Sequence, residues 1–396
     1  MDEPEKIQRT DRILDRVGRL VAVGVGISVV VHAVSPFHSF LSYWVLWFIA
    51  FYVVTLGFGR PVEARMKRLH RGLLCAVLAA APVLVGIQIY QHREETKAIR
   101  AKAVLEKTLA TGLWIAYEPI SIDPYNKTCP PSDVIRRELQ ILLGGGFNSL
   151  ITFSASGSLA DIPRIAKELG FRGVIMGIID ITDKGEVSSA ITARDYVDAY
   201  CVGHMFTDYP YSELDLLETI GRVRRATSRP VTTTLRPNGY LVFPKISHAI
   251  DFFFPDIHAN WYSDGTAAHA RKATELFVSE VRQLQERYPD KAVLLKLISI
   301  PSKEVPGAST EQQYHFYRQV VEYVKSSMTF PERVYPSYFS AFDLPWKSPE
   351  RKWPPGERYI GFYDVHGKPK VALIGGVKVR VVDALHWSRV STIEKR

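Results

Sequence analysis

The stretch 335–347, YPSYFSAFDLPWK, runs from a strand-like segment into a cluster of aromatic and charged side chains. Its first half is rich in aromatic residues, which favour β-strands. Its end gathers Phe339, Phe342, Asp343, Trp346 and Lys347. Aromatic rings beside short polar groups suit a sugar site, because pyranose ring faces stack on Trp and Tyr while hydroxyls form hydrogen bonds. A plug of aromatic side chains closing one end of the fold is an equally good interpretation.

Seven further β-rich runs precede this stretch, at 113–117, 149–153, 173–178, 198–203, 230–234, 249–257 and 292–298. Between most of them lie amphipathic, helix-like segments at 132–143, 161–169, 213–227, 267–287 and 310–325. Eight strands mostly alternating with helices predict an α/β fold of the (β/α)8 TIM barrel type. A doubly wound open sheet is the rival, but no Gly-rich phosphate loop follows the first strand. The glycines at 144–146 follow a helix and indicate its C-cap.

The first ninety residues contain three nearly uncharged runs, Val17–Val34, Phe40–Phe58 and Gly72–Tyr90. Each is about 18 to 20 residues long, enough to cross a bilayer as a helix. Lys and Arg are concentrated before the first run and between the second and third runs. The link between the first and second runs, SPFHS, has none. The positive-inside rule therefore predicts a cytoplasmic N-terminus and an extracytoplasmic chain after Tyr90, periplasmic in a bacterial inner membrane.

Charge and cysteine usage narrow the function classes further. The formal net charge is +9, but the topology signals near the N-terminus account for most of it, which argues against a nucleic-acid partner. Cys129 and Cys201 would both face an oxidising compartment and could pair, although nothing in the sequence brings them together. Cys75 lies inside the third apolar run, and no metal-ligand spacing is present, so we expect neither metal nor cofactor.

These observations predict four regions: a membrane domain at 1–91, a helical stalk at 92–110, the barrel at 111–373 and a C-terminal tail at 374–396. Chemistry in such barrels lies at the C-terminal ends of the strands. Those strand ends are therefore where candidate site residues are expected.

The segments FSAFDLPWK (339–347) and IGFYDVHGKPKVAL (360–373) resemble the closing motif of glycoside hydrolase family 17, the β-1,3-glucanase-like barrels. Further segments resemble the family in the same order: LITFSA (150–155), DIPRIAKELGFRGVIMGI (161–178), PVTTT (230–234) and DFFFPDIHANWY (251–262). The last keeps His258 and Trp261 of the family pattern. The resemblance covers about residues 111–373 and implies the same barrel fold.

The resemblance also implies where two catalytic glutamates should lie. The acid/base position falls on Met205 and the nucleophile position on Leu297, so both glutamates are absent. A retaining glycosidase needs one carboxylic acid and one carboxylate about 5 to 5.5 Å apart, and neither residue can replace them.

Asp208, Glu118 and Glu304 are the best substitute carboxylates, although loop acids are more often solvated. His204 and His258 could act as general bases, but histidines at strand ends more often form hydrogen-bonding walls. The cluster and the resemblance together predict a sugar-binding set of Tyr117, His204, His258, Trp261, Tyr262, Asp343, Trp346 and Lys347.

Three functions remain open. The first is a membrane-anchored, catalytically degenerate barrel, a pseudoenzyme that binds or guides a β-glucan-type polysaccharide beside a membrane glycan synthase or exporter. The second is a divergent β-glucan hydrolase or transglycosylase with relocated carboxylates. The third is a structural subunit of a glycan-synthesis assembly that binds no sugar.

Overall fold

The computed structural model describes residues 89–374 and 377–378, apart from 127, 205–210, 259–266, 299, 314–315, 318–325, 327–332 and 371–372. The chain divides into two compact units, Met1–Arg93 and Glu94–Arg396. The three predicted membrane spans lie outside the described residues, except for the last two residues of the third. Within the described part, no helix is both long enough and apolar enough to span a bilayer.

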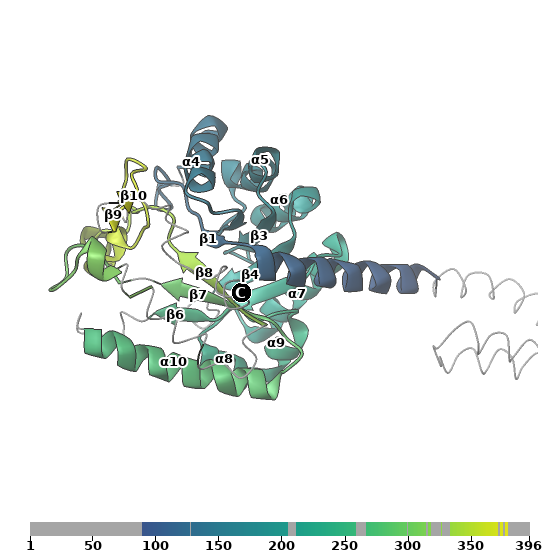
Figure 1. Cartoon of the computed structure of the whole chain (residues 1–396). Coiled ribbons are helices and arrows are strands. Elements are labelled where there is room, and N and C mark those ends of the chain that lie inside the picture. The colour runs from purple at the N-terminus through teal and green to yellow at the C-terminus, as the bar shows by residue number, and fades with distance from the viewer. Residues whose placement is uncertain are drawn as a thin grey trace, which may run out of the picture. The chain divides into compact units, whose positions relative to one another are not determined.

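Eight parallel strands form one sheet in the order β5-β4-β3-β2-β1-β8-β7-β6 (Figure 1). Their bounds are β1 Trp114–Ala116, β2 Ser149–Ile151, β3 Gly173–Ile178, β4 Ala199–His204, β5 Val231–Thr234, β6 Asp256–His258, β7 Val293–Ile298 and β8 Val334–Phe339. Each strand falls within one residue of its predicted run or inside it, and β1 pairs with β8. The sheet thus curls into a nearly closed barrel, as predicted.

β5 and β6 are the two edge strands of the sheet, and threonine side chains of β5 connect them. Thr232 Oγ1 donates to Phe252 O at 2.6 Å, and Thr234 Oγ1 donates to Phe254 O at 2.9 Å. The backbone adds Asp251 N to Val231 O at 2.8 Å. The segment before β6 therefore lies against β5 and completes the ring.

Helices cover the outside of the barrel (Figure 1). They are α4 Ser132–Gly144, α5 Ile162–Leu169, α6 Lys184–Thr192, α7 Glu213–Thr227, α8 Pro237–Val242, α9 Pro244–Ala249 and α10 Ala267–Arg287. The predictions for α4, α5, α7 and α10 are confirmed, and most of the predicted helix at 310–325 lies outside the described residues. The sequence analysis missed α6, α8 and α9, because α6 contains Gly and Ser and the other two are single short turns.

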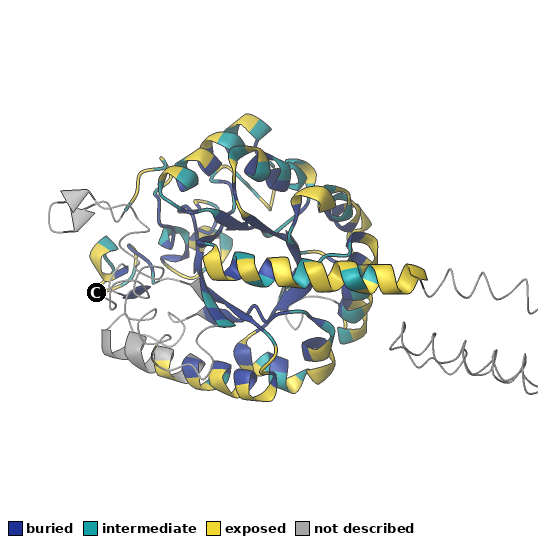
Figure 2. Cartoon of the chain, turned by 45° about the vertical axis from the view of Figure 1, so that its right-hand side comes forward, coloured by how far each residue is buried: buried dark blue, intermediate teal, exposed yellow. Residues whose placement is uncertain are grey.

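The strands alternate between two cores, as the pleat requires. One core lies between strands and helices, and the other fills the barrel with Trp114, Ala116, Ile151, Ile175, Ala199, Cys201, Phe252, Phe254, Leu294 and Phe339. The strands are buried on both faces, which Figure 2 shows in dark blue. This explains why their sequences are continuously apolar rather than alternating.

The predicted helical stalk at 92–110 lies within a helix that precedes β1 and is described over residues 89–111. Leu105 and Leu109 are each 1% exposed and belong to the core that fills the barrel. Arg333 Nη2 donates to Glu106 Oε1 at 2.9 Å, close to the start of β8. The part of this helix after Glu94 therefore packs against the N-terminal end of the barrel, because the apolar residues of the helix cover the opening at that end.

Glu138 on α4 is buried between the barrel and the helices. Its Oε2 accepts a 2.7 Å hydrogen bond from the Tyr117 hydroxyl, and its Oε1 accepts one of 3.3 Å from Ile120 N. Burial raises the pKa of Glu138 to about 7, and it raises the pKa of Tyr117 as well. This carboxyl group thus ties the end of β1 and the loop after it to α4.

Glu138 should make the protein less stable as the pH rises. Because its pKa is higher in the folded state than in the unfolded state, its contribution is complete below about pH 4.5 and is lost as the pH passes about 7. We expect the free energy of unfolding to fall by roughly 2–3 kcal/mol from this group between pH 5 and pH 8. Urea denaturation at pH 5 and at pH 8 measures this change in the free energy of unfolding. Glu138→Gln should flatten the dependence, whereas the exposed control Glu218→Gln should not; an unchanged slope in Glu138→Gln would contradict the assignment.

Candidate functional site

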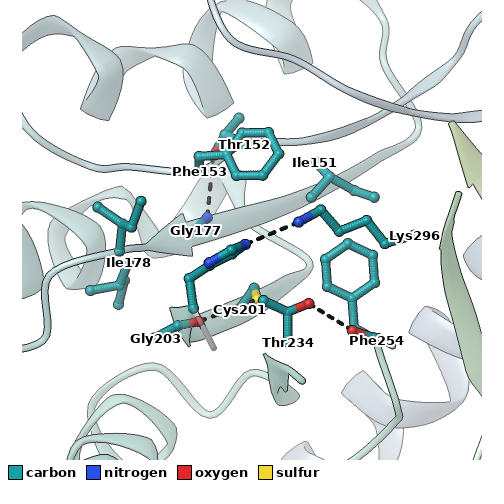
Figure 3. Close-up of a pocket in the computed structure, with 12 residues that line it drawn as sticks. Ile151, Thr152, Phe153, Gly177, Ile178, Cys201, Gly203, Thr234, Phe254 and Lys296 are labelled. Atoms are coloured by element: carbon teal, nitrogen blue, oxygen red, sulfur yellow. Dashed lines mark hydrogen bonds between the residues drawn. The ribbon is translucent and has the colours of Figure 1, made fainter. Parts of the chain in front are cut away.

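A pocket opens at the C-terminal end of the barrel, where barrel enzymes hold their sites. Its empty space is about 280 Å³, including the open mouth. Residues on or just after β2, β3, β4, β5 and β7, and one before β6, line it: Ile151, Thr152, Phe153, Gly177, Ile178, Ile179, Cys201, Gly203, His204, Thr234, Phe254 and Lys296 (Figure 3). Because this space includes the open mouth, the enclosed part of the pocket is much smaller than a usual small-molecule site.

Lys296, on β7, occupies the centre of the pocket floor. Its ammonium group lies 3.1 Å from Asp256 Oδ1 and 3.0 Å from His204 Nε2, the contact drawn as a dashed line from Lys296 in Figure 3. An ammonium group can only donate, so His204 accepts at Nε2 and holds its own proton on Nδ1. The Lys296 side chain is only 3% exposed, and charges so deeply buried persist only when they are paired.

Two aromatic rings complete the surroundings of Lys296. Its Nζ lies 5.4 Å from the ring centre of Phe153 and 5.1 Å from that of Phe339. Ring faces attract a cation, so both contacts stabilise the charge inside the barrel. The pocket therefore holds a buried lysine–aspartate ion pair beside two aromatic rings.

A β-bulge at the end of β4 turns His204 into the pocket. Cys201 pairs with Thr232 and His204 with Thr234, so β4 has one residue more than β5 between these pairs. Gly203 has φ +71°, a conformation that glycine adopts at little cost. Without the extra residue, the alternation would place His204 on the opposite face from Cys201.

The Cys201 thiol lies beside this site inside the barrel. Burial raises its pKa to about 12, so it stays protonated and is a poor nucleophile. Cys129 is half-buried, and both cysteines are free, so the disulfide left open by the sequence is absent.

A second buried ion pair lies where β1 and β8 end. Lys347 Nζ is 3.4 Å from Glu118 Oε2, with side-chain exposures of 5% and 14%. The same ammonium lies 4.7 Å from the ring centre of Phe339 and 5.1 Å from that of Trp346. The structure thus brings together three of the predicted site residues, Glu118, Trp346 and Lys347. The Phe339 ring lies near the ammonium groups of both Lys347 and Lys296.

Two other predicted residues hold loops together. Asp343 Oδ1 accepts from Lys370 Nζ at 2.7 Å and from Gly361 N at 3.0 Å, which ties β8 to the closing segment. Burial raises the pKa of Asp343 and lowers that of Lys370. Glu304 pairs with Arg358, and this hydrogen-bonded ion pair lowers the pKa of the Glu304 carboxyl.

Tyr117 does not lie in the pocket, contrary to the sequence-based prediction. Its ring packs edge-on against Phe342 at 6.1 Å, and its hydroxyl donates to Glu138. It follows β1 on the side that faces α4, because Trp114 and Ala116 occupy the inward positions.

Other predicted residues lie where the structure gives no side-chain description. Met205, Asp208, Trp261 and Tyr262 lie outside the described residues. His258 and Leu297 are in paired strands, but their side chains are not described. Their assignments stay predictions. No group of His, Cys, Asp and Glu suited to a metal occurs in the described ranges.

Sequence analysis also missed residues that shape the pocket. A lysine inside the apolar run AVLLKLI is unusual for a buried strand, and that pattern could have indicated Lys296. No sequence pattern of this kind indicated Glu186 on α6. Its carboxylate accepts from Ala155 N at 3.1 Å and Ile179 N at 3.0 Å, so it fixes the loops after β2 and β3.

Comparison with solved structures identifies the type of barrel. An active-site mutant of the Rhizomucor miehei β-1,3-glucanosyltransferase in complex with laminaritriose matches with a TM-score of 0.52 and 18% identity, covering 67% of this chain and 99% of that one. GH5_18 from Streptomyces cattleya in complex with GlcNAc has a TM-score of 0.52 and 15% identity, covering 71% and 81%. The fold is a glycoside-hydrolase-like (β/α)8 barrel.

An endo-laminarinase from Formosa Hel1_33_131 has the same type of barrel, with a TM-score of 0.50 and 14% identity, covering 65% of this chain and 84% of that one. No protein-family model matches the chain, and neither does any curated protein. At these identities the likeness concerns the fold alone. It confirms a glycoside-hydrolase-like barrel without distinguishing family 17 from other families.

Removing one partner of the central ion pair should destabilise the barrel. Lys296→Met leaves the Asp256 carboxylate buried without its ammonium, and we expect a loss of about 3–5 kcal/mol in the free energy of unfolding. The double variant Lys296→Met/Asp256→Leu should recover most of that loss, because neither charge then remains. Urea denaturation measures both against the exposed control Lys303→Met. A Lys296→Met variant as stable as that control would contradict the pairing.

Proposed function

We propose that this chain is a membrane-anchored barrel that binds or guides a β-glucan-type polysaccharide without the usual hydrolase activity. We further propose that the chain is related to glycoside hydrolase family 17, which its closing motif resembles. In this proposal the predicted membrane domain is the anchor and the barrel lies outside the cytoplasm.

Ligands of similar barrels support the substrate class. The glucanosyltransferase structure holds laminaritriose, and the Formosa protein is an endo-laminarinase. The aromatic residues at the end of β8, Phe339 and Trp346, lie beside charged groups, which suits sugar rings and their hydroxyls.

One observation carries the absence of hydrolysis: five described carboxylates on or after β1, β6, β7 and β8 each pair with a basic side chain. The pairs are Asp123–Arg351, Glu118–Lys347, Asp256–Lys296, Glu304–Arg358 and Asp343–Lys370. A nucleophilic carboxylate must be free to attack, and a general acid needs a raised pKa near the leaving oxygen. Ion pairing neutralises the first role and opposes the second, although burial still raises the pKa of the paired Asp343.

His204 and Lys296, the residues next to the predicted glutamate positions Met205 and Leu297, support this proposal. The end of β4 presents His204, held by the Lys296 ammonium, and β7 presents Lys296 itself. A cation and a neutral imidazole can hydrogen-bond sugar hydroxyls but cannot form a glycosyl ester. A membrane glycan synthase or exporter is the partner that such a glycan-guiding barrel would serve.

The full chain in mild detergent should bind β-linked gluco-oligosaccharides without cleaving them. We expect calorimetric binding of laminari-oligosaccharides, no release of new reducing ends, and roughly tenfold weaker binding by Trp346→Ala, which loses an aromatic contact. Thermal melting of this variant controls for its folding.

Turnover that is abolished by Asp208→Asn, Glu118→Gln or Glu304→Gln would instead assign a hydrolase or transglycosylase with relocated carboxylates. No binding to any β-glucan would contradict the proposal and favour a structural subunit.

A further inference from the structure

Three aromatic side chains meet at the rim of the barrel mouth, beside the pocket. Tyr125 lies in the loop between β1 and α4, and Trp346 and Trp353 follow β8. The rings of Tyr125 and Trp346 are 6.2 Å apart, and those of Trp346 and Trp353 are 5.2 Å apart, both edge-on. Because β1 and β8 are neighbours in the sheet, their loops come together there. We call these three residues the rim platform.

Tyr125 is exposed and yet fixed in place. It is 56% exposed, but its hydroxyl accepts a 2.9 Å hydrogen bond from Trp353 Nε1. Its backbone N donates to Asp123 Oδ1 at 3.0 Å, and the Arg351 guanidinium lies 5.1 Å from its ring centre. An exposed tyrosine ordinarily keeps its rotamer freedom, so this arrangement has already lost the entropy that ligand binding would otherwise cost.

The two loops are held together by a bidentate ion pair. Arg351 Nη1 and Nη2 donate to the two carboxylate oxygens of Asp123 at 2.7 and 3.0 Å. Asp123 also accepts from Asn126 Nδ2 at 2.8 Å. Planar two-point pairing of this kind fixes geometry as well as charge. It surrounds the Tyr125 ring with groups that can hydrogen-bond hydroxyls.

The rim platform is connected to the pocket floor through Phe339. Lys347 Nζ lies 5.2 Å from the Trp353 ring and 4.7 Å from the Phe339 ring. Phe339 in turn lies 5.1 Å from Lys296 Nζ in the pocket. A row of alternating rings and cations therefore leads from the pocket to the rim on the β1–β8 side.

We propose that the rim platform is a second sugar-binding position, which stacks one glucosyl unit of a chain whose other units reach the pocket. The inference rests on the proposed binding of β-glucans and goes beyond it, because it assigns Tyr125 and Trp353, neither of which is part of the pocket lining. The exposed face of Tyr125 stacks on the apolar face of the pyranose. Arg351 and Asn126 beside it hydrogen-bond the hydroxyls.

The test compares oligosaccharides of two lengths on the full chain in mild detergent. Laminariheptaose is long enough to reach both positions, whereas laminaribiose is not. We expect Tyr125→Ala to weaken binding of the heptaose roughly 3- to 10-fold and to leave binding of the biose unchanged, as measured by calorimetry. Tyr125→Phe keeps the ring and should keep most of the affinity for the heptaose.

Tyr196→Ala is the matched control, because Tyr196 is a 40% exposed tyrosine that precedes β4 and so lies at the opposite end of the barrel. A Tyr125→Ala variant that binds the heptaose as tightly as Tyr196→Ala overturns the rim platform and leaves the proposed function standing. If Tyr125→Ala weakens binding of the heptaose and the biose equally, the rim platform is overturned as well, because it would not be a binding position separate from the pocket. Parent protein that binds neither sugar contradicts the proposed function itself.

Discussion

The Lys296 ammonium joins five parts of the barrel at its C-terminal end. It extends from β7 to the Asp256 carboxylate on β6 and the His204 ring on β4, at 3.1 and 3.0 Å. The rings of Phe153 after β2 and Phe339 on β8 pack edge-on against each other at 5.5 Å and both lie beside it. A charge inside a barrel costs several kcal/mol unless it is paired, so these groups must stay together for the mouth to keep its shape.

This constraint also determines which chemistry the mouth can support. A barrel that hydrolyses glycosides needs two carboxyl groups whose pKa values are moved apart by their surroundings. One is then protonated and the other ionised. At this mouth several described carboxylates lie next to cations, as Glu118 does beside Lys347. Donors and ring faces therefore lie side by side there, an arrangement that suits the proposed binding of hydroxyl-rich ligands.

Local features of the chain place these groups accurately. The bulge at Gly203 turns His204 inward, and Glu186 fixes the two loops that border the pocket. On the other side, the Asp123–Arg351 pair joins the loops after β1 and β8. Rigid positioning of this kind lowers the entropic cost of binding, which would favour the proposed binding of a flexible polysaccharide.

The sequence by itself determined the barrel, because eight apolar runs separated by helical patterns leave few other arrangements. It also indicated the aromatic end of β8, and its resemblance to family 17 predicts that two catalytic glutamates are absent. Only the tertiary structure decided how the charges pair: His204 and Lys296 are 92 positions apart, and their contact depends on the curl of the sheet and on one extra residue in β4. It likewise turned Tyr117 toward α4 and packed Leu105 and Leu109 into the barrel. Burial and pairing depend on which residues the fold brings together, and a linear pattern does not contain that information.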